Sequence, residues 1–155
     1  MNLYLVQHGE SKSEEEDPER RLTEKGIAEV QKVAKFLSAL RLSVNAVWHS
    51  GKPRAQQTAE LVAEAIGASD RIEQQEGLAP KDKVAPTKKV LEQSSGDVMI
   101  VGHLPFLGKL VALLVTGDEG NEIVQFQFGS IVCLEQREGG RWKVAWMIRP
   151  ALLHG

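Results

Sequence analysis

The sequence predicts an α/β protein: a three-layer α/β/α sandwich around a central, mostly parallel sheet, formed by a single domain over residues 1–155. Three short apolar runs, rich in β-branched residues, lie at 3–6, 44–48 and 98–101. Continuous apolar runs of this kind suit strands that are covered on both faces. Each run is followed by a segment with helical periodicity, and this alternation favours a parallel sheet with helices on both sides.

The helices that follow these strands are predicted over residues 23–40, 53–67 and 105–117. The first begins at a threonine, a residue type that caps helices, and its apolar residues recur at three- and four-residue steps. The other two begin with a proline, which suits a first helical turn, and end at a glycine, which suits a helix C-terminus.

The rest of the chain is less regular. A fourth helix is predicted over residues 81–94, although Pro80 and Pro86 disturb its start. The acidic stretch 14–19 is predicted to be an exposed loop. Near the C-terminus, alternating polar and apolar residues predict strands, with a hairpin turn at 138–141. These strands are residues 123–128, 130–136 and 142–148.

Composition excludes several classes of protein. The formal net charge of −2 lacks the basic excess that nucleic-acid binding requires. The single cysteine, Cys133, allows no intrachain disulfide and no cysteine-based zinc cluster. No apolar run approaches the roughly 20 residues of a membrane span, and the N-terminus lacks the order of a signal peptide. We therefore expect a cytoplasmic monomer with no membrane or nucleic-acid partner.

Three of the four histidines follow the predicted parallel strands directly: His8, His49 and His103. The carboxyl ends of parallel strands lie at one edge of a sheet, which is where open α/β folds bind ligands. Arg54 adds a permanent, fork-shaped cation near that edge. Small residues there let backbone amides approach an anion. They are Gly9, Ser50, Gly51 and Gly102. This edge therefore predicts an oxyanion or phosphate pocket.

Such a pocket suggests phosphoryl transfer. A neutral imidazole is a nucleophile near neutral pH, and attack on phosphorus needs alignment and positive charge around the equatorial oxygens. His8 would attack while Arg54 and His103 hold those oxygens, without a metal or an organic cofactor. A three-histidine metal site is the competing interpretation. It is disfavoured by the arginine beside the pocket and by the absence of closely spaced ligand pairs.

Four motifs carry a family resemblance, which runs from residue 3 to about residue 115 and continues more weakly to residue 130. In this order and spacing they resemble the histidine phosphatase superfamily, with its phosphoglycerate mutase-like fold, and most of all its small bacterial phosphohistidine phosphatases of the SixA type. The motifs are His8-Gly9 after the first strand, Leu22-Thr23 with Gly26, RAQQTA at 54–59, and GHLP at 102–105.

The resemblance implies a role for each matching residue. His8 would be the phosphate-accepting nucleophile, and Arg54 and His103 would be phosphate ligands. The substrate would be a phosphorylated protein carrying phosphohistidine. Residues implied to lie around the phosphate are Gln7, Gly9, Arg20 and His49.

The chain departs from the family pattern at Gln7, where the family has arginine. Glutamine keeps hydrogen-bond donors but loses the charge and the planar fork, which by analogy with losing one transition-state donor costs on the order of 10²-fold in rate. His49 is a second departure. Glu76 is the nearest match to the general acid of the family, and Asp82 is a weaker one. Phosphohistidine relaxes the need for this acid, because a protonated imidazole leaves by itself.

Three functions remain open. The leading prediction is a protein phosphohistidine phosphatase that works through a covalent phosphohistidine at His8. The second is a catalytically impaired pseudo-phosphatase that binds phosphate through Arg54 and His103. The third is a small-molecule phosphomonoesterase, although the short chain leaves little room for insertions that would enclose a small substrate.

Overall fold

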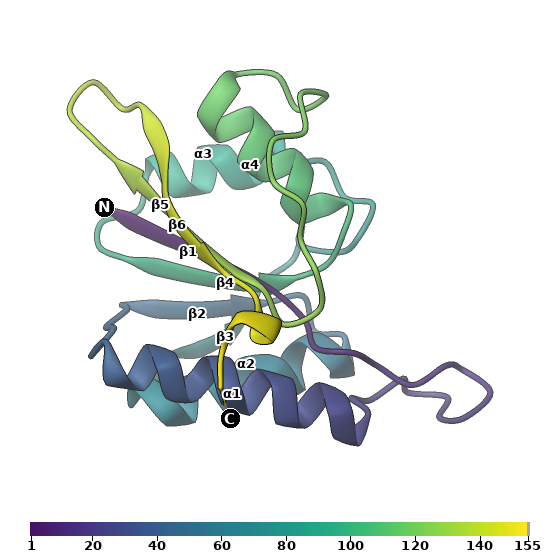
Figure 1. Cartoon of the computed structure of the whole chain (residues 1–155). Coiled ribbons are helices and arrows are strands. Elements are labelled where there is room, and N and C mark those ends of the chain that lie inside the picture. Colours follow the sequence, from purple (N-terminus) through teal and green to yellow (C-terminus); the bar gives the residue numbers. More distant parts are fainter. Residues whose placement is uncertain (155) are drawn as a thin grey trace.

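The computed structural model of the protein describes residues 1–154 and has three layers, a sheet between two layers of helices (Figure 1). The strands are β1 (Asn2–Gln7), β2 (Ala46–His49), β3 (Ile72–Gln74), β4 (Val98–Gly102), β5 (Ile131–Gln136) and β6 (Trp142–Ile148). The helices are α1 (Glu24–Ala39), α2 (Pro53–Ile66), α3 (Ala85–Glu92) and α4 (Phe106–Thr116), with short 3-10 turns at η1 (Ser69–Arg71) and η2 (Pro150–Leu152).

The six strands form one mixed sheet in the order β3-β2-β4-β1-β5-β6. The first four in this order are parallel, whereas β5 pairs antiparallel with β1 and β6 antiparallel with β5. The predicted three-layer fold with a mostly parallel sheet is therefore confirmed. Gln7 is paired with Gly102 and His49 with Val101, so the three strands that precede the histidines end at the same level.

Two apolar cores lie on opposite faces of the sheet, because side chains alternate along each strand. From β1, Tyr4 and Val6 pack toward α1 and α2, while Leu3 and Leu5 pack toward α3 and α4. All four side chains are buried. The burial of both faces explains why these strands are continuous apolar runs in the sequence.

The helix boundaries follow the predicted signals. The Thr23 hydroxyl accepts a hydrogen bond from the Gly26 N–H at 2.9 Å and caps α1. Helices α2 and α4 end at Gly67 and Gly117, whose φ angles of 73° and 80° are favourable for glycine.

Two sequence predictions are wrong in detail. Helix α3 covers only Ala85–Glu92, not 81–94, because Pro86 is favourable only in a first turn. Residues 123–128 form no strand among the described residues, although their alternation is real: Val124 and Phe126 are buried. The predicted exposed loop at 14–19 is confirmed, apart from the buried Asp17, whose carboxylate accepts hydrogen bonds from Arg21.

Strand β3 was not anticipated from the sequence, since it has three residues and is only partly buried. The hairpin turn at 138–141 is present between β5 and β6. None of the helices within residues 1–154 combines the length and the apolar character needed to cross a membrane.

Candidate active site

His8 and His103 face each other at the carboxyl edge of the sheet. His8 follows β1 directly, His103 follows β4 directly, and their ring centroids are 5.1 Å apart. The His8 N–H donates to the Gly102 carbonyl at 3.0 Å, which joins the two strand ends. The Phe128 ring lies on another side of His8, at 5.5 Å between centroids. Both imidazoles are buried, so they lie at the bottom of the site.

The tautomer of His8 follows from its hydrogen bond. Its Nδ1 lies 2.7 Å from the Gly9 carbonyl oxygen, and because a carbonyl only accepts, Nδ1 carries the proton. The lone pair therefore lies on Nε2. Burial, with smaller effects from the charges of Arg54 and Arg20, lowers the pKa of His8 to about 4. His8 is thus neutral at physiological pH, with a free nucleophilic nitrogen.

His103 has one hydrogen-bonded and one unpaired ring nitrogen. Its Nε2 lies 2.6 Å from Ser50 Oγ, which itself accepts a hydrogen bond from the Lys52 N–H. A Ser50 hydroxyl that donates to Nε2 would leave the ring proton on Nδ1. Nδ1 is buried and has no partner among the described residues.

Positive charge surrounds His103 and is not neutralised. Burial, and then the charges of His8, Arg54, Lys52 and Arg20, lower the pKa of His103 to about 3. Arg54 is half-buried and takes part in no ion pair within residues 1–154. Burial and the nearby Arg20 also lower the pKa of Arg54 itself. An anion bound here would relieve this repulsion.

Thr58 connects the nucleophile loop to the helix that carries Arg54. Its fully buried hydroxyl accepts from the Gly9 N–H at 3.1 Å and donates to the Arg54 carbonyl at 2.8 Å. Because the hydroxyl acts both as an acceptor and as a donor, it holds Gly9 and the first turn of α2 in one arrangement.

Two glycines let this loop lie directly against α1. A Cβ added to Gly9 would come within 2.8 Å of Val30 Cγ2, and one added to Gly26 would overlap the Glu10 carbonyl oxygen. Neither position has room for a side chain. The loop after His8 is therefore in backbone contact with the start of α1.

Gln7 lies at the end of β1 with its side chain buried. Its backbone is paired with the segment before β5: its N–H donates to Ser130 at 3.0 Å and its carbonyl accepts from Gly129 at 3.1 Å. The amide oxygen Oε1 is buried without a partner among the described residues. Gln7 thus places an amide, and no charge, beside the nucleophile.

Arg20 lies in the loop that projects from the sheet between β1 and α1 (Figure 1). It adopts a positive φ of 52°, and its guanidinium donates to the Lys12 carbonyl at 3.2 Å and to the Ser11 hydroxyl at 3.5 Å. Its charge contributes to the lowered pKa values of His8 and His103, which places it at the rim of the same site.

His49 and Glu76 are not brought into contact with this group. The Nδ1 of His49 accepts from the Gly51 N–H at 3.0 Å, so His49 shapes the turn between β2 and α2. Glu76 lies exposed in the turn after β3, and within residues 1–154 its carboxylate takes part in no hydrogen bond or ion pair. Asp82 accepts a hydrogen bond from the Ala79 N–H and is also exposed.

Three side chains at the site were not predicted as functional: Ser50, Thr58 and Phe128. Thr58 could have been found, because it lies four residues after Arg54 and so on the same side of a helix. Ser50 was noted only as a small residue. Phe128 has no local sequence signal that would connect it to His8.

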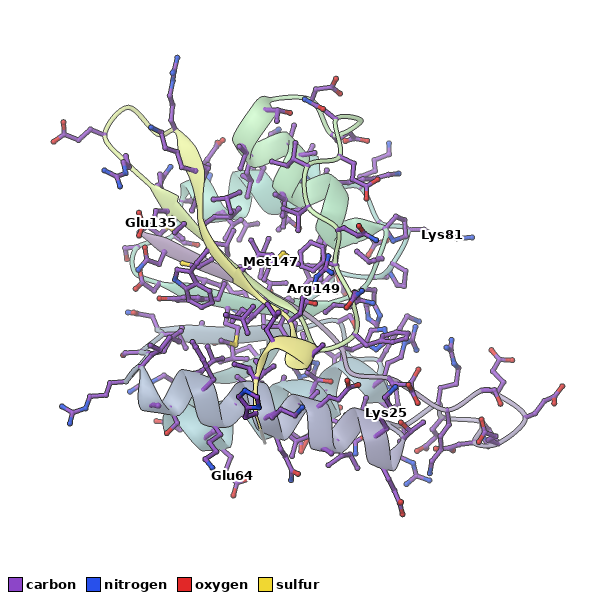
Figure 2. All side chains as sticks on the ribbon, in the orientation of Figure 1. Lys25, Glu64, Lys81, Glu135, Met147 and Arg149 are labelled. Carbon is purple, nitrogen blue, oxygen red and sulfur yellow. The ribbon has the colours of Figure 1, made fainter. Side chains whose placement is uncertain are left out.

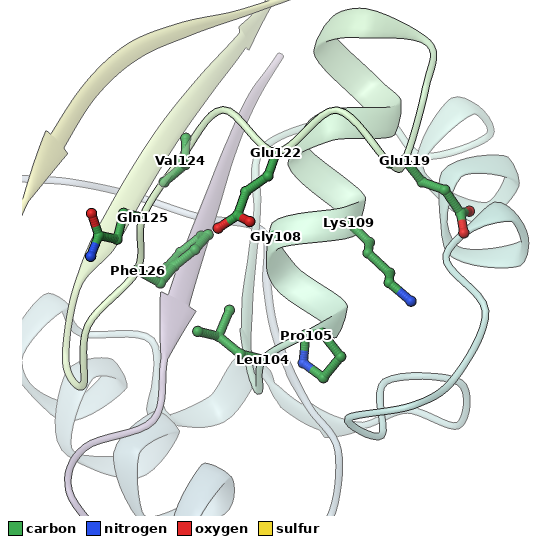
Figure 3. A pocket seen from close by; sticks show the side chains of 10 residues that line it. Leu104, Pro105, Gly108, Lys109, Glu119, Glu122, Val124, Gln125 and Phe126 are labelled. Carbon is green, nitrogen blue, oxygen red and sulfur yellow. The ribbon is translucent and has the colours of Figure 1, made fainter.

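A pocket of about 360 Å³ begins immediately after His103, at Leu104 and Pro105. Figure 3 shows it between the start of α4 and the segment containing Phe126, with Lys109 and Glu119 on one side and Glu122 on the other. His8, Arg54 and His103 do not line this pocket. In the described part of the chain, no cluster of three or more His, Cys, Asp or Glu side chains could hold a metal ion.

The fold and this edge define an α/β protein with two buried, facing histidines and nearby arginine charges at the carboxyl edge of its sheet. Residues 3–80 match the Histidine phosphatase superfamily (branch 1), and the chain belongs to this family. An uncharacterized protein of Picosynechococcus sp. is 32% identical over 131 residues, which are 79% of this chain and 78% of that protein. The phosphohistidine phosphatase SixA of Escherichia coli is 26% identical, over 99% of this chain and 96% of SixA.

Solved structures agree with this assignment. The structure of the protein histidine phosphatase SixA complexed with tungstate superposes with a TM-score of 0.87 at 25% identity, over 98% of this chain and 99% of that one. A phosphoglycerate mutase from Bacillus anthracis has the same fold, with a TM-score of 0.73 at 16% identity over 93% of this chain and 91% of the mutase. The predicted phosphoglycerate mutase-like fold is thereby confirmed.

Proposed function

We propose that this protein is a protein phosphohistidine phosphatase that works through a covalent phosphohistidine at His8. The observation that carries the proposal is the state of His8: a neutral imidazole with its lone pair on Nε2, whose ring centroid lies 5.1 Å from that of His103. The similarity to SixA in sequence and in structure supports it, and the SixA structure holds tungstate, a tetrahedral oxyanion like phosphate.

The reaction has two displacements at phosphorus. In the first, the Nε2 lone pair of His8 attacks, the P–N bond of the substrate breaks, and its electron pair leaves with the substrate imidazole, which keeps a proton. In the second, water attacks the phosphorus, the bond to His8 breaks, and inorganic phosphate leaves. Arg54 and His103 would stabilise the equatorial oxygens in both steps, with Arg20 at the rim.

The donors around the phosphoryl group would be completed by neutral groups. The Gln7 amide would supply an uncharged N–H where the family has a cation. Gly9 would bring the loop after His8 close to the phosphoryl oxygens. His49 would act indirectly, because its Nδ1 is occupied by the turn that carries Ser50.

The position of Glu76 favours phosphohistidine over phosphate esters. An alkoxide leaving group needs a proton in the transition state, and a general acid must reach it. Glu76 is exposed in a turn, and its carboxylate makes no hydrogen bond or ion pair with these residues within residues 1–154. A protonated imidazole leaves without this help, so the proposed substrate is the one that the site handles with the groups it has.

The missing arginine supports a second candidate function, a phosphohistidine-binding module with impaired turnover. Arg54, Arg20 and His103 would still bind the phosphoryl group, while the transition state would lack one cation at Gln7. A small-molecule phosphomonoesterase is the less favoured alternative, since the short chain leaves little room for insertions that would enclose a small substrate.

One experiment separates these functions. Hydrolysis of a phosphohistidine protein and of an aryl phosphate is measured for the wild type, His8→Ala and Gln7→Arg. We expect the wild type to hydrolyse phosphohistidine in preference to the aryl phosphate, and His8→Ala to be inactive. An inert wild type that becomes active as Gln7→Arg would establish the binding module instead. Turnover that survives His8→Ala would refute the covalent mechanism.

A further inference from the structure

The Ser50 hydroxyl is the one group within residues 1–154 that hydrogen-bonds to the imidazole ring of His103. It lies in the turn between β2 and α2, and its Oγ is 2.6 Å from His103 Nε2. The other ring nitrogen, Nδ1, is buried and has no partner in the described part of the chain. His103 is only 1% exposed, so bulk water does not orient the ring either. Which edge of the imidazole faces the turn therefore depends on Ser50.

The direction of this hydrogen bond follows from counting the groups that it satisfies. Ser50 Oγ accepts the Lys52 N–H at 3.3 Å, and within residues 1–154 its own proton has no acceptor other than His103 Nε2. If the hydroxyl donates to Nε2, the ring proton lies on Nδ1, and this N–H alone is left without a partner. If Nε2 donates instead, the hydroxyl proton and the Nδ1 lone pair are both left without one. Unpaired polar groups cost free energy, so the first arrangement is favoured.

The position of the ring proton matters because His103 is neutral. Burial, with smaller effects from neighbouring charges, lowers the pKa of His103 to about 3. An imidazolium donates from both nitrogens, whereas a neutral imidazole donates from one and accepts at the other. Moving the proton between them moves the positive end of the ring dipole across the ring, which is centred 5.1 Å from the ring of His8.

His49 holds the turn in which Ser50 makes this contact. It is the last residue of β2, is 4% exposed, and is paired with Val101 of the neighbouring strand β4. Its Nδ1 accepts the Gly51 N–H at 3.0 Å, so this bond closes the backbone over Ser50. Gly51 has a φ of 89°, and a Cβ there would overlap the side chain of Gln74. Ser50 is thus fixed between a buried strand end and a tightly packed glycine.

We propose that Ser50 is a positioning residue for His103 and that His49 holds Ser50 in place. The Ser50 hydroxyl donates to Nε2 and keeps the ring proton of His103 on Nδ1. This proposal rests on the proposed function, because it assigns His103 to phosphoryl transfer. Removing the partner that orients a metal-binding histidine typically costs about 10- to 100-fold in activity or affinity, and a neutral hydroxyl belongs at the lower end of that range.

The test reads the tautomer of His103 directly. Protein labelled with ¹⁵N-histidine is studied by NMR at pH 7 as wild type, Ser50→Ala, Ser50→Thr and Ser94→Ala, and the His103 signals are those absent from His103→Gln. Ser94→Ala is the matched control, since Ser94 is also half-buried and its hydroxyl donates one hydrogen bond, to the Val90 carbonyl at 2.9 Å.

We expect the His103 proton on Nδ1 in the wild type and in Ser94→Ala. In Ser50→Ala the two tautomers should be mixed, and Ser50→Thr, which keeps a hydroxyl, should restore the wild-type state. A wild-type proton on Nε2, or a tautomer that is unchanged in Ser50→Ala, would overturn the proposal. The wild-type measurement decides this even if Ser50→Ala does not fold.

The kinetic consequence is measured with the same variants on a phosphohistidine protein. Ser50→Ala and His49→Ala should lower kcat/KM by about 10-fold. Ser50→Thr and His49→Asn should retain most of it, because the asparagine amide oxygen can accept the Gly51 N–H in place of Nδ1. Full activity in Ser50→Ala would overturn the positioning role. If the wild type does not hydrolyse phosphohistidine, the phosphatase proposal fails, while the tautomer, which is measured without turnover, still decides whether Ser50 orients His103.

Discussion

The two flanks of His8 differ in charge and in hydrogen bonding. On one flank, which we call the cationic flank, lie Arg20, Lys52 and Arg54. On the other lies a hollow lined by Glu10, Lys25, Glu29 and Phe128, which we call the acidic flank; Figure 2 labels Lys25 near the start of α1. The proposed nucleophile therefore lies between a region rich in cations and a region with two carboxylates.

This difference indicates how a substrate would be oriented. A phosphoryl group bears negative charge on its equatorial oxygens throughout the transfer, so it belongs on the cationic flank.

Removing the cation of the first flank should have the largest effect. Arg54→Ala takes away an unpaired guanidinium that would contact the transferring oxygens, and we expect kcat/KM for phosphohistidine to fall by about 10²- to 10³-fold. Steady-state kinetics on a phosphohistidine protein would measure it. Arg137→Ala, an exposed arginine on the β5–β6 hairpin, is the matched control. A loss below ten-fold in Arg54→Ala would contradict the separation of the flanks.

Removing the Thr58 hydroxyl, which links the loop after His8 to α2, should have a smaller effect, and on stability. Thr58→Val keeps the shape but leaves the buried Gly9 N–H without its acceptor, and we expect the free energy of unfolding to fall by about 1–3 kcal/mol. Urea denaturation would measure the change. Thr87→Val is the control, since Thr87 is buried on α3 and its side chain makes no hydrogen bond within residues 1–154. Equal losses in both variants would show that the Thr58 bridge contributes nothing specific.

The smallest change is expected in the protonation of His8 and His103 between pH 7 and pH 5. Because burial and the cationic flank lower the pKa of His8 to about 4 and that of His103 to about 3, neither ring gains a proton between pH 7 and pH 5. Their NMR signals should therefore be constant over this range, and His8 should become protonated, and lose its nucleophilic lone pair, only below about pH 4. In Arg54→Ala the pKa of His8 should rise, since one neighbouring charge is gone. A midpoint for His8 near 6.5 in the wild type would show that the flank does not act on it.

The parts of the fold that were predictable are those with strong local signals. The strands β1, β2 and β4 are continuous apolar runs, and their helices begin and end at prolines, a threonine and glycines, so the parallel sheet and its ligand edge followed. Strand β3 has three residues with little burial, which is too short for a periodic pattern. Residues 123–128 alternate because they cross the edge of the sheet with Val124 and Phe126 inward, and alternation alone cannot show whether a strand partner exists.

The candidate site also has one part that the sequence predicted and one part that it did not. His8, Arg54 and His103 come from strand ends and a helix start, and topology alone places them at one edge. The acidic flank combines that edge with α1 and with Phe128, a residue 120 positions after His8 in a segment without regular structure. No periodicity or motif connects these parts, so this flank became visible only in three dimensions. The hydrogen bond from the Gly129 N–H to the Gln7 carbonyl joins the segment that carries Phe128 to the end of β1.

The backbone contact between the loop after His8 and α1 limits how closely this loop can approach the helix. With no Cβ at Gly9 or Gly26, the loop lies at the smallest distance from the helix that two peptide chains allow. A surface of side chains can yield by rotamer changes, but two peptide backbones in contact cannot. The depth of the nucleophile is thus set by the closest approach of two backbones, which gives the reproducibility of about 0.5 Å that in-line chemistry demands.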